Sequence, residues 1–240
     1  AYGKKLYNAA LVLHQGVIKE EIAKTLLPTY NVFDEYRYFE PNTEFKLWEF
    51  NGVKIAITIC EDLWDIDEDH IYKNSPMKAL KKLGPDLMIN LSGSPFSYKH
   101  IETRRELMRQ NALQYNLPLV YVNQVGSNTD LIFDGGSMFI SREGVIADEL
   151  DYFSEDYRVV SWEPDLVYQS HSHNYKNDDI ELIYNALKMG VVDYFQKSGF
   201  KNAILGLSGG IDSAVVTALV ADALGKDHVF PVMLPSVFSS

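Results

Sequence analysis

Short apolar runs separated by turn residues predict strands through most of the first two thirds of this chain. Runs at 6–13 and 17–23 flank a turn at 14–16, and runs at 47–50 and 53–59 flank Asn51-Gly52, a strong hairpin signal. Helices are predicted at 77–83 and 101–115. Further strands are predicted at 86–91, 119–123, 137–140, 145–150 and 157–162. The mixture indicates an α/β fold.

The pattern changes near residue 163. Residues 163–179 are polar and lack a period, which is typical of a linker, although a long surface loop within one domain would read the same way. Beyond it, the chain predicts a helix at 180–197 and then a strand, helix and strand at 202–205, 214–224 and 228–234. Such a strand–helix–strand unit is a parallel crossover. We therefore divide the chain into domains at 1–162 and 180–240.

The turn inside this crossover carries the clearest chemistry. Adjacent glycines let the backbone approach a ligand and direct N–H groups at it, and the following helix adds its positive N-terminal end. An anion such as a phosphate is the natural ligand, and two serine hydroxyls add donors. The turn consists of Gly206, Leu207, Ser208, Gly209, Gly210, Ile211, Asp212 and Ser213.

Asp212 would repel a phosphate unless a cation lay between the two groups, so the turn predicts Mg²⁺ held by Asp212 and phosphate oxygens. The lysine of a Walker A loop is missing, which excludes an ordinary P-loop. A tight turn whose serine caps the helix is the alternative for the Ser-Gly-Gly part alone. The whole run Ser-Gly-Gly-x-Asp-Ser resembles the pyrophosphate-binding loop of the ATP pyrophosphatase superfamily.

Composition narrows the class of protein. The 240 residues are 46% hydrophobic, which predicts a globular chain, and the net charge of −11 argues against non-specific binding to nucleic acid or to anionic membranes. A single cysteine excludes an internal disulfide and suits the cytoplasm. No apolar run approaches the length of a membrane span.

That cysteine, Cys60, falls where the strand 53–59 ends. A sharp turn there would present the sulfur in a cleft, and Lys24, at the end of strand 17–23, could lower the thiol pKa and stabilise an oxyanion. The alternatives are a buried, inert cysteine and a surface lysine. The sequence does not show that the two side chains meet.

Several runs resemble the nitrilase (carbon–nitrogen hydrolase) superfamily. The run 24–39 is similar to its catalytic-lysine segment, and Ile59-Cys60-Glu61-Asp62-Leu63-Trp64 is similar to its nucleophile segment. The runs 89–96, 122–126 and 133–137 match its later strands. A nitrilase-like domain followed by the Ser-Gly-Gly-x-Asp-Ser motif resembles the glutamine-dependent NAD⁺ synthetases.

The resemblance implies an αββα nitrilase-like sandwich followed by the start of a Rossmann-like domain of the adenine nucleotide alpha hydrolase type. It implies that Cys60 attacks the glutamine amide while Lys24 stabilises the oxyanion. By position, Tyr30 and Ser94 would hold glutamine, and Glu35 would be the supporting glutamate or a solvated loop acid. Where the family has a lysine, this chain has His100, with Lys99 one residue earlier, so either could contact glutamine.

In the second site, the resemblance implies that ATP lies on the glycine turn and adenylates deamido-NAD⁺, which ammonia then converts to NAD⁺. In the family, the general-base glutamate lies N-terminal to the first hairpin of this chain, and so outside this sequence. At the other end, a lone β-α-β unit cannot cover both faces of a parallel sheet. We therefore expect a piece of a longer protein, and by resemblance a homo-oligomer. The alternatives are another amidotransferase with a pyrophosphate loop, or a non-catalytic nitrilase-fold module.

Overall fold

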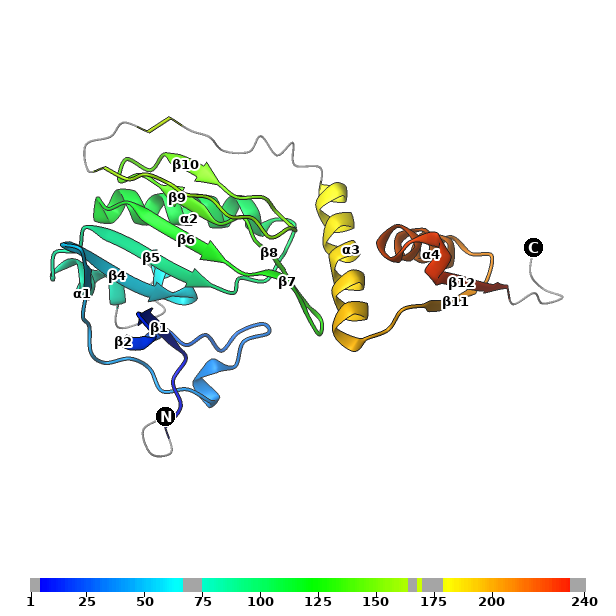
Figure 1. Ribbon diagram of the computed structural model, residues 1–240, viewed down its shortest axis with the longest axis horizontal. Helices are drawn as coiled ribbons and strands as arrows, with labels where there is room; N and C mark the ends of the chain where they lie inside the picture. The colour runs from blue at the N-terminus through cyan, green and yellow to red at the C-terminus, as the bar shows by residue number, and fades with distance from the viewer. Residues whose placement is uncertain (1–4, 67–74, 164–167, 170–178, 234–240) are drawn as a thin grey trace.

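A six-stranded mixed sheet organises the first part of the protein, whose computed structural model describes residues 5–66, 75–163, 168–169 and 179–233 (Figure 1). The strand order across the sheet is β10-β9-β6-β5-β4-β3. In chain order its strands are β3 (Trp48–Phe50), β4 (Val53–Ile59), β5 (Leu87–Ser92), β6 (Leu119–Asn123), β9 (Met138–Ile140) and β10 (Ile146–Glu149).

The three central strands β4, β5 and β6 run parallel, and β3, β9 and β10 pair antiparallel to their neighbours. Thr58 on β4 lies opposite Asn90 on β5, and Ser92 on β5 lies opposite Asn123 on β6. Carboxyl ends of parallel strands meet at one edge of a sheet. Residues that directly follow β4, β5 and β6 are therefore neighbours, and Cys60 is the first of them.

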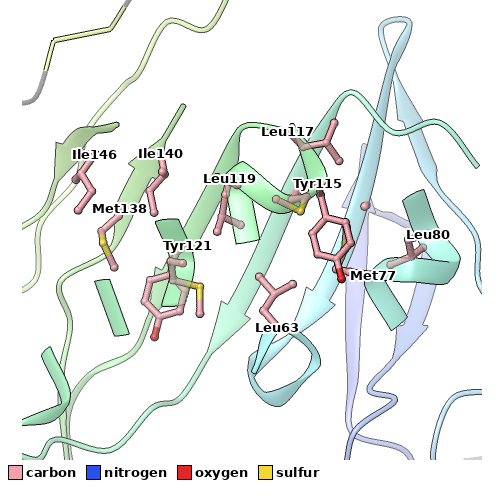
Figure 2. Close-up of a cluster of buried hydrophobic side chains, with 14 residues drawn as sticks. Leu63, Met77, Leu80, Tyr115, Leu117, Leu119, Tyr121, Met138, Ile140 and Ile146 are labelled. Carbon is pink, nitrogen blue, oxygen red and sulfur yellow. The ribbon is translucent and has the colours of Figure 1, made fainter. Parts of the chain in front are cut away.

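One face of this sheet is covered by α1 (Pro76–Lys81) and α2 (His100–Tyr115). Their apolar side chains meet those of the strands in the main core, whose members include Leu63, Met77, Leu119 and Tyr121 (Figure 2). Successive strand residues point to opposite faces, so Ala56 enters this core while its neighbours Ile55 and Ile57 do not.

The opposite face of β4 is covered by the antiparallel hairpin of β1 (Ala9–His14) and β2 (Val17–Ala23). Ala10 packs there with Ile55, Ile57 and Ile59. This hairpin matters for function because β2 ends directly before Lys24. The packing of the hairpin on β4 therefore brings the Lys24 segment to the strand that ends before Cys60.

A second hairpin, β7 (Val125–Asn128) and β8 (Leu131–Asp134), extends from the sheet to the long helix α3 (Asp179–Ser198) (Figure 1). The Ser127 N–H donates to Asp193 Oδ2 at 2.7 Å, and Lys197 Nζ donates to the Ser127 carbonyl and contacts the same carboxylate. These contacts join the first part of the protein to α3.

The remainder is a parallel pair, β11 (Ala203–Leu207) and β12 (Val229–Met233), connected through α4 (Ile211–Leu224). Ala203, Val220 and Val229 form its small core, to which α3 adds Val191 and Phe195. The predicted parallel crossover is confirmed. Three 3₁₀ turns complete the described elements: η1 (Glu35–Arg37), η2 (Cys60–Leu63) and η3 (Lys226–His228).

The predicted strands at 17–23, 53–59 and 119–123 are confirmed to the residue. The strand predicted at 157–162 is wrong: Tyr157 and Val159 are 84% and 80% exposed, so its apolar positions have no partner strand and no face to bury. Most of the expected linker, 163–179, lies outside the described residues. Within the described part of the chain, no helix is long and apolar enough to span a membrane.

Candidate functional site

Cys60 occupies a sharp turn between β4 and η2. Its backbone has φ +44°, in the left-handed region that side chains rarely adopt, and the side chain is half-buried. The Asn90 amide donates to the Cys60 carbonyl at 3.3 Å and to Thr58 Oγ1 at 3.0 Å. The turn is therefore held from the neighbouring strand.

Lys24 is almost completely buried, with 1% of its side chain exposed. Its backbone is fixed by hydrogen bonds to the Asn8 carbonyl at 2.7 Å and from the Asn42 N–H at 2.9 Å. The ammonium lies 2.6 Å from Glu35 Oε1, and Asn8 donates to the other oxygen of that carboxylate. A buried ammonium needs such a partner, and Glu35 supplies it.

The groups around Cys60 shift the pKa of its thiol in opposite directions. Burial raises the pKa of the thiol above its ordinary value, and the Lys24 ammonium and the Ser92 hydroxyl lower it. Glu61 and Glu35 raise the pKa further. Burial prevails, so in the free protein the thiol is neutral at pH 7 and Lys24 is the positive charge that favours its ionised form. Cys60 and Lys24, which the sequence could not join, lie within electrostatic reach.

Tyr30 contacts the residue that directly follows Cys60. It is 44% exposed, and its hydroxyl contacts both carboxylate oxygens of the buried Glu61, at 2.9 and 2.8 Å. Ser94 follows β5 and is 4% exposed, and its N–H donates to Asn123 Oδ1 at 3.0 Å. Ser94 follows β5 at the same edge of the sheet as Cys60, and Tyr30 reaches that edge through its contact with Glu61.

The side chains of Lys99 and His100 lie against different aromatic rings. Lys99 is exposed, with its ammonium 5.4 Å above the centre of the Tyr98 ring. The His100 ring lies 6.1 Å from the ring of Trp64, the residue that ends the Cys60 turn. Of the two, His100 therefore faces the nucleophile segment.

Sequence reasoning assigned no role to a group of buried polar residues that connects to Ser94. Arg104 and Asp134 form a bidentate ion pair, at 2.9 and 2.8 Å, with both side chains fully buried. Asn123 joins Asp134 to the Gly135 carbonyl and to Ser94. The available signal was a polar residue inside an apolar strand, as at Asn90 and Asn123.

The glycine turn at 206–213 is exposed and divided between two elements. Gly206 and Leu207 end β11, and Ile211, Asp212 and Ser213 begin α4. The Ser213 hydroxyl accepts from the Ser208 N–H at 3.3 Å and donates to the Gly210 carbonyl at 2.9 Å. Gly209 has φ +89° and open space around it, so its conformation rather than crowding requires glycine.

Asp212 contributes a single exposed carboxylate at the first turn of α4. Among the described residues, no group of three or more His, Cys, Asp or Glu side chains is arranged as a metal site. This donor set fits Mg²⁺, which commonly takes one or two carboxylates and completes its shell with substrate phosphates and water.

Comparisons with known proteins match both parts of the chain to families. The carbon-nitrogen hydrolase family model matches residues 1–171, and the NAD synthase model matches residues 183–240. A glutamine-dependent NAD(+) synthetase of Synechocystis sp. is 43% identical over 99% of this chain. The match covers 43% of that relative, so this chain spans less than half its length.

Solved structures give the same result. Glutamine-dependent NAD+ synthetase from Acinetobacter baumannii, in complex with ADP, matches 98% of this chain and 43% of its own chain with a TM-score of 0.82 and 36% identity. A carbon-nitrogen hydrolase from Helicobacter pylori matches 62% of this chain and 54% of its own with a TM-score of 0.54 and 22% identity, which supports the fold alone. The predicted nitrilase-like fold is confirmed. The chain belongs to the carbon-nitrogen hydrolase family.

Proposed function

We propose that this chain contains the glutaminase domain, at residues 1–162, and the start of the ATP-binding domain, at residues 180–240, of a glutamine-dependent NAD⁺ synthetase. Residues 163–179 would be the linker between them. The observation that carries the proposal is the buried Lys24 ammonium acting on the pKa of Cys60 at the end of β4. The relative of 43% identity supports the same activity. The enzyme would be a ligase with glutamine as amide donor.

In the first reaction, the Cys60 thiolate attacks the side-chain carbonyl carbon of glutamine and a carbon–sulfur bond forms. The carbonyl π pair moves to oxygen, where the Lys24 ammonium stabilises the negative charge. Collapse of this intermediate breaks the carbon–nitrogen bond, and the nitrogen takes up the proton that the Cys60 thiol lost on forming the thiolate and leaves as ammonia. Water then cleaves the thioester to give glutamate and the free thiol.

The surrounding residues would orient glutamine. Tyr30 contacts Glu61, the residue after Cys60, Ser94 is held by Asn123 beyond the end of β5, and the His100 ring lies near Trp64. Glu35 holds the Lys24 ammonium in place, and this contact is consistent with the role of supporting glutamate predicted for Glu35. No general base is assigned to Glu35 or Glu61, because each already accepts a hydrogen bond from a protein group.

In the second reaction, ATP would bind at the glycine turn, where backbone N–H groups and the hydroxyls of Ser208 and Ser213 can meet its phosphates. The carboxylate of deamido-NAD⁺ attacks the α-phosphorus and pyrophosphate leaves. Ammonia then attacks the activated acyl carbon and AMP leaves, which gives the amide. Mg²⁺ held by Asp212 would neutralise phosphate charge during these steps.

Separate nitrogen sources test the two sites. In the protein that carries this chain, Cys60→Ala should abolish NAD⁺ formation with glutamine and leave NAD⁺ formation with ammonium chloride intact. Glutamine should also protect Cys60 from alkylation by iodoacetamide. If Cys60→Ala keeps its glutamine-dependent rate, or if glutamine does not protect the thiol, the glutaminase proposal fails and a non-catalytic nitrilase-fold module gains support.

The acceptor is tested by pyrophosphate release. Release with deamido-NAD⁺ supports the synthetase, and release only with xanthylate identifies another amidotransferase. We further propose a cytoplasmic homo-oligomer. The single cysteine supports the cytoplasmic location, and the family resemblance supports the oligomer. Sedimentation of the purified protein measures the number of subunits.

A further inference from the structure

Asp62 is a buried carboxylate two residues after Cys60, and the reactions above do not use it. It lies within η2 and is 4% exposed. Burial raises its pKa to about 6, although three backbone N–H donors lower it. A carboxylate in such a position requires an explanation, because removing it from water is costly.

Both oxygens of Asp62 accept hydrogen bonds from backbone groups on two different segments. Oδ1 accepts from the N–H of Thr25 at 3.0 Å and from the N–H of Leu26 at 2.8 Å. Oδ2 accepts from the N–H of Ile59 at 3.0 Å. One carboxylate therefore binds the two residues that follow Lys24 and the residue that precedes Cys60.

These contacts make Asp62 a connector and not a ligand group. It borders a cavity of about 670 Å³ together with Thr25 and Thr58, yet the three N–H groups already occupy its oxygens. Its partners are all donors. Asparagine has only one acceptor oxygen, and its NH₂ group would face a backbone N–H, where donor meets donor. A carboxylate is therefore the side chain that can accept from all three backbone N–H groups.

The connection spans the two segments that must be in register for catalysis. Thr25 and Leu26 are more than thirty residues from Asp62 in sequence, whereas Ile59 adjoins the strained Cys60. Lys24 itself is otherwise held by Asn8, Glu35 and Asn42, all outside the nucleophile turn. A further polar contact between the two segments joins the hydroxyl of the exposed Tyr30 to Glu61. Asp62 is thus a direct polar link between the lysine and the cysteine segments, and a displacement of about 1 Å can cost about 10²-fold in rate.

We propose that Asp62 is a positioning residue that holds Lys24 in register with Cys60. The inference rests on the thiol chemistry proposed above and adds to it the group that sets the distance between ammonium and sulfur. Loss of Asp62 should therefore act on Cys60 as loss of Lys24 does.

The test measures alkylation of Cys60 by iodoacetamide across pH, by mass spectrometry of the peptide that contains Cys60. The variants are Asp62→Asn, Lys24→Ala and the double variant in the protein that carries this chain. The charged and titratable groups that also act on the thiol, Glu35, Glu61 and Tyr121, stay unchanged. We expect Asp62→Asn to shift the profile to higher pH, as Lys24→Ala does, and the double variant to shift no further than Lys24→Ala alone.

Glu149→Gln is the matched control. Glu149 is a fully buried carboxylate on β10, four strands away from β4, and it accepts from the Tyr152 hydroxyl at 2.6 Å. This variant removes a buried charge without touching the site, so its alkylation profile should match that of the wild type. If Asp62→Asn has the wild-type profile and only a lower melting temperature, the proposal is overturned.

Two further measurements complete the design. If Asp62→Asn does not fold, Asp62→Ser, which adds no NH₂ group, replaces it in the same comparison. In glutamine hydrolysis, Asp62→Asn should lower kcat by about 10- to 100-fold and leave KM nearly unchanged; a change in KM alone contradicts the proposal. Failure of glutamine to protect wild-type Cys60 would reject the proposed function, while the alkylation comparison would still decide the role of Asp62.

Discussion

The two candidate sites are built in opposite ways. The Cys60 site joins segments that are far apart in the chain, and its residues are held by buried contacts such as Lys24 with Glu35 and Arg104 with Asp134. The glycine turn is one continuous stretch, 206–213, whose hydrogen bonds connect residues at most five positions apart. One site depends on tertiary packing and the other on local backbone conformation.

This difference predicts how each site responds to damage. Around Cys60, a removed partner leaves a buried charge or polar group without compensation, which is costly. At the glycine turn the side chains are exposed, apart from the half-buried Leu207 and Ser213, and water can replace a lost contact. Mutations of the same chemical kind should therefore have large effects in the first region and small effects in the second.

The largest effect is expected at the buried ion pair. Asp134→Ala leaves the fully buried Arg104 guanidinium without its bidentate partner and should lower the free energy of unfolding by about 3–5 kcal/mol. Urea denaturation measures the change. A loss below about 1 kcal/mol would show that water reaches Arg104 and would remove the main contrast between the regions.

Two glycines give a matched comparison with an intermediate effect. Gly136 has φ +63°, and a Cβ there would lie 2.3 Å from Tyr152 Cε1, whereas Gly209 has φ +89° and open space. Gly136→Ala should cost about 2–4 kcal/mol in unfolding free energy, and Gly209→Ala only about 1–2 kcal/mol. Thermal unfolding of both variants checks the order, and equal losses would contradict the contrast.

The thiol itself should show a pH dependence of modest size. Because burial raises the pKa of Cys60, the reactive thiolate forms only at high pH, so alkylation should still accelerate as the pH rises through 9. Lys24 lowers the pKa, so Lys24→Ala should slow alkylation several-fold at pH 8. A rate that levels off near pH 7 in the wild type would mean that Lys24 prevails over burial.

The smallest effect is expected at an exposed ion pair of the second region. Lys188 Nζ lies 2.6 Å from Asp222 Oδ2, yet 40% and 48% of the two side chains are exposed. Lys188→Ala should leave the melting temperature unchanged within error, at low and at high salt. A clear loss of stability at low salt would place this pair closer to the buried class.

The sequence predicted much of the fold because turn residues bounded its apolar runs. Strands β2, β4 and β6 have their predicted ends, and the Asn51-Gly52 hairpin is confirmed. The hairpin β7–β8 was missed as a unit because its turn, with Thr129 at φ +57°, lacks glycine and proline. At 157–162 a strand-like pattern found no partner, which only the tertiary structure could show.

The candidate sites differ in the same way. The glycine turn could be located from its eight residues, because local conformation determines it. The Cys60 site could be assembled only by resemblance, since spacing alone does not join Lys24 to Cys60. Asp62 was overlooked because its function lies in backbone contacts with Thr25, Leu26 and Ile59, and no residue pattern encodes those.

The left-handed backbone at Cys60 has an evolutionary consequence. Glycine is the residue that adopts such a conformation at least cost, and any other residue loses about 1–2 kcal/mol there. Selection for heat resistance alone would therefore favour glycine at this position and remove the thiol. A sulfur-bearing side chain at this left-handed position is what the proposed role of Cys60 in glutamine hydrolysis would require, because stability alone would not select it.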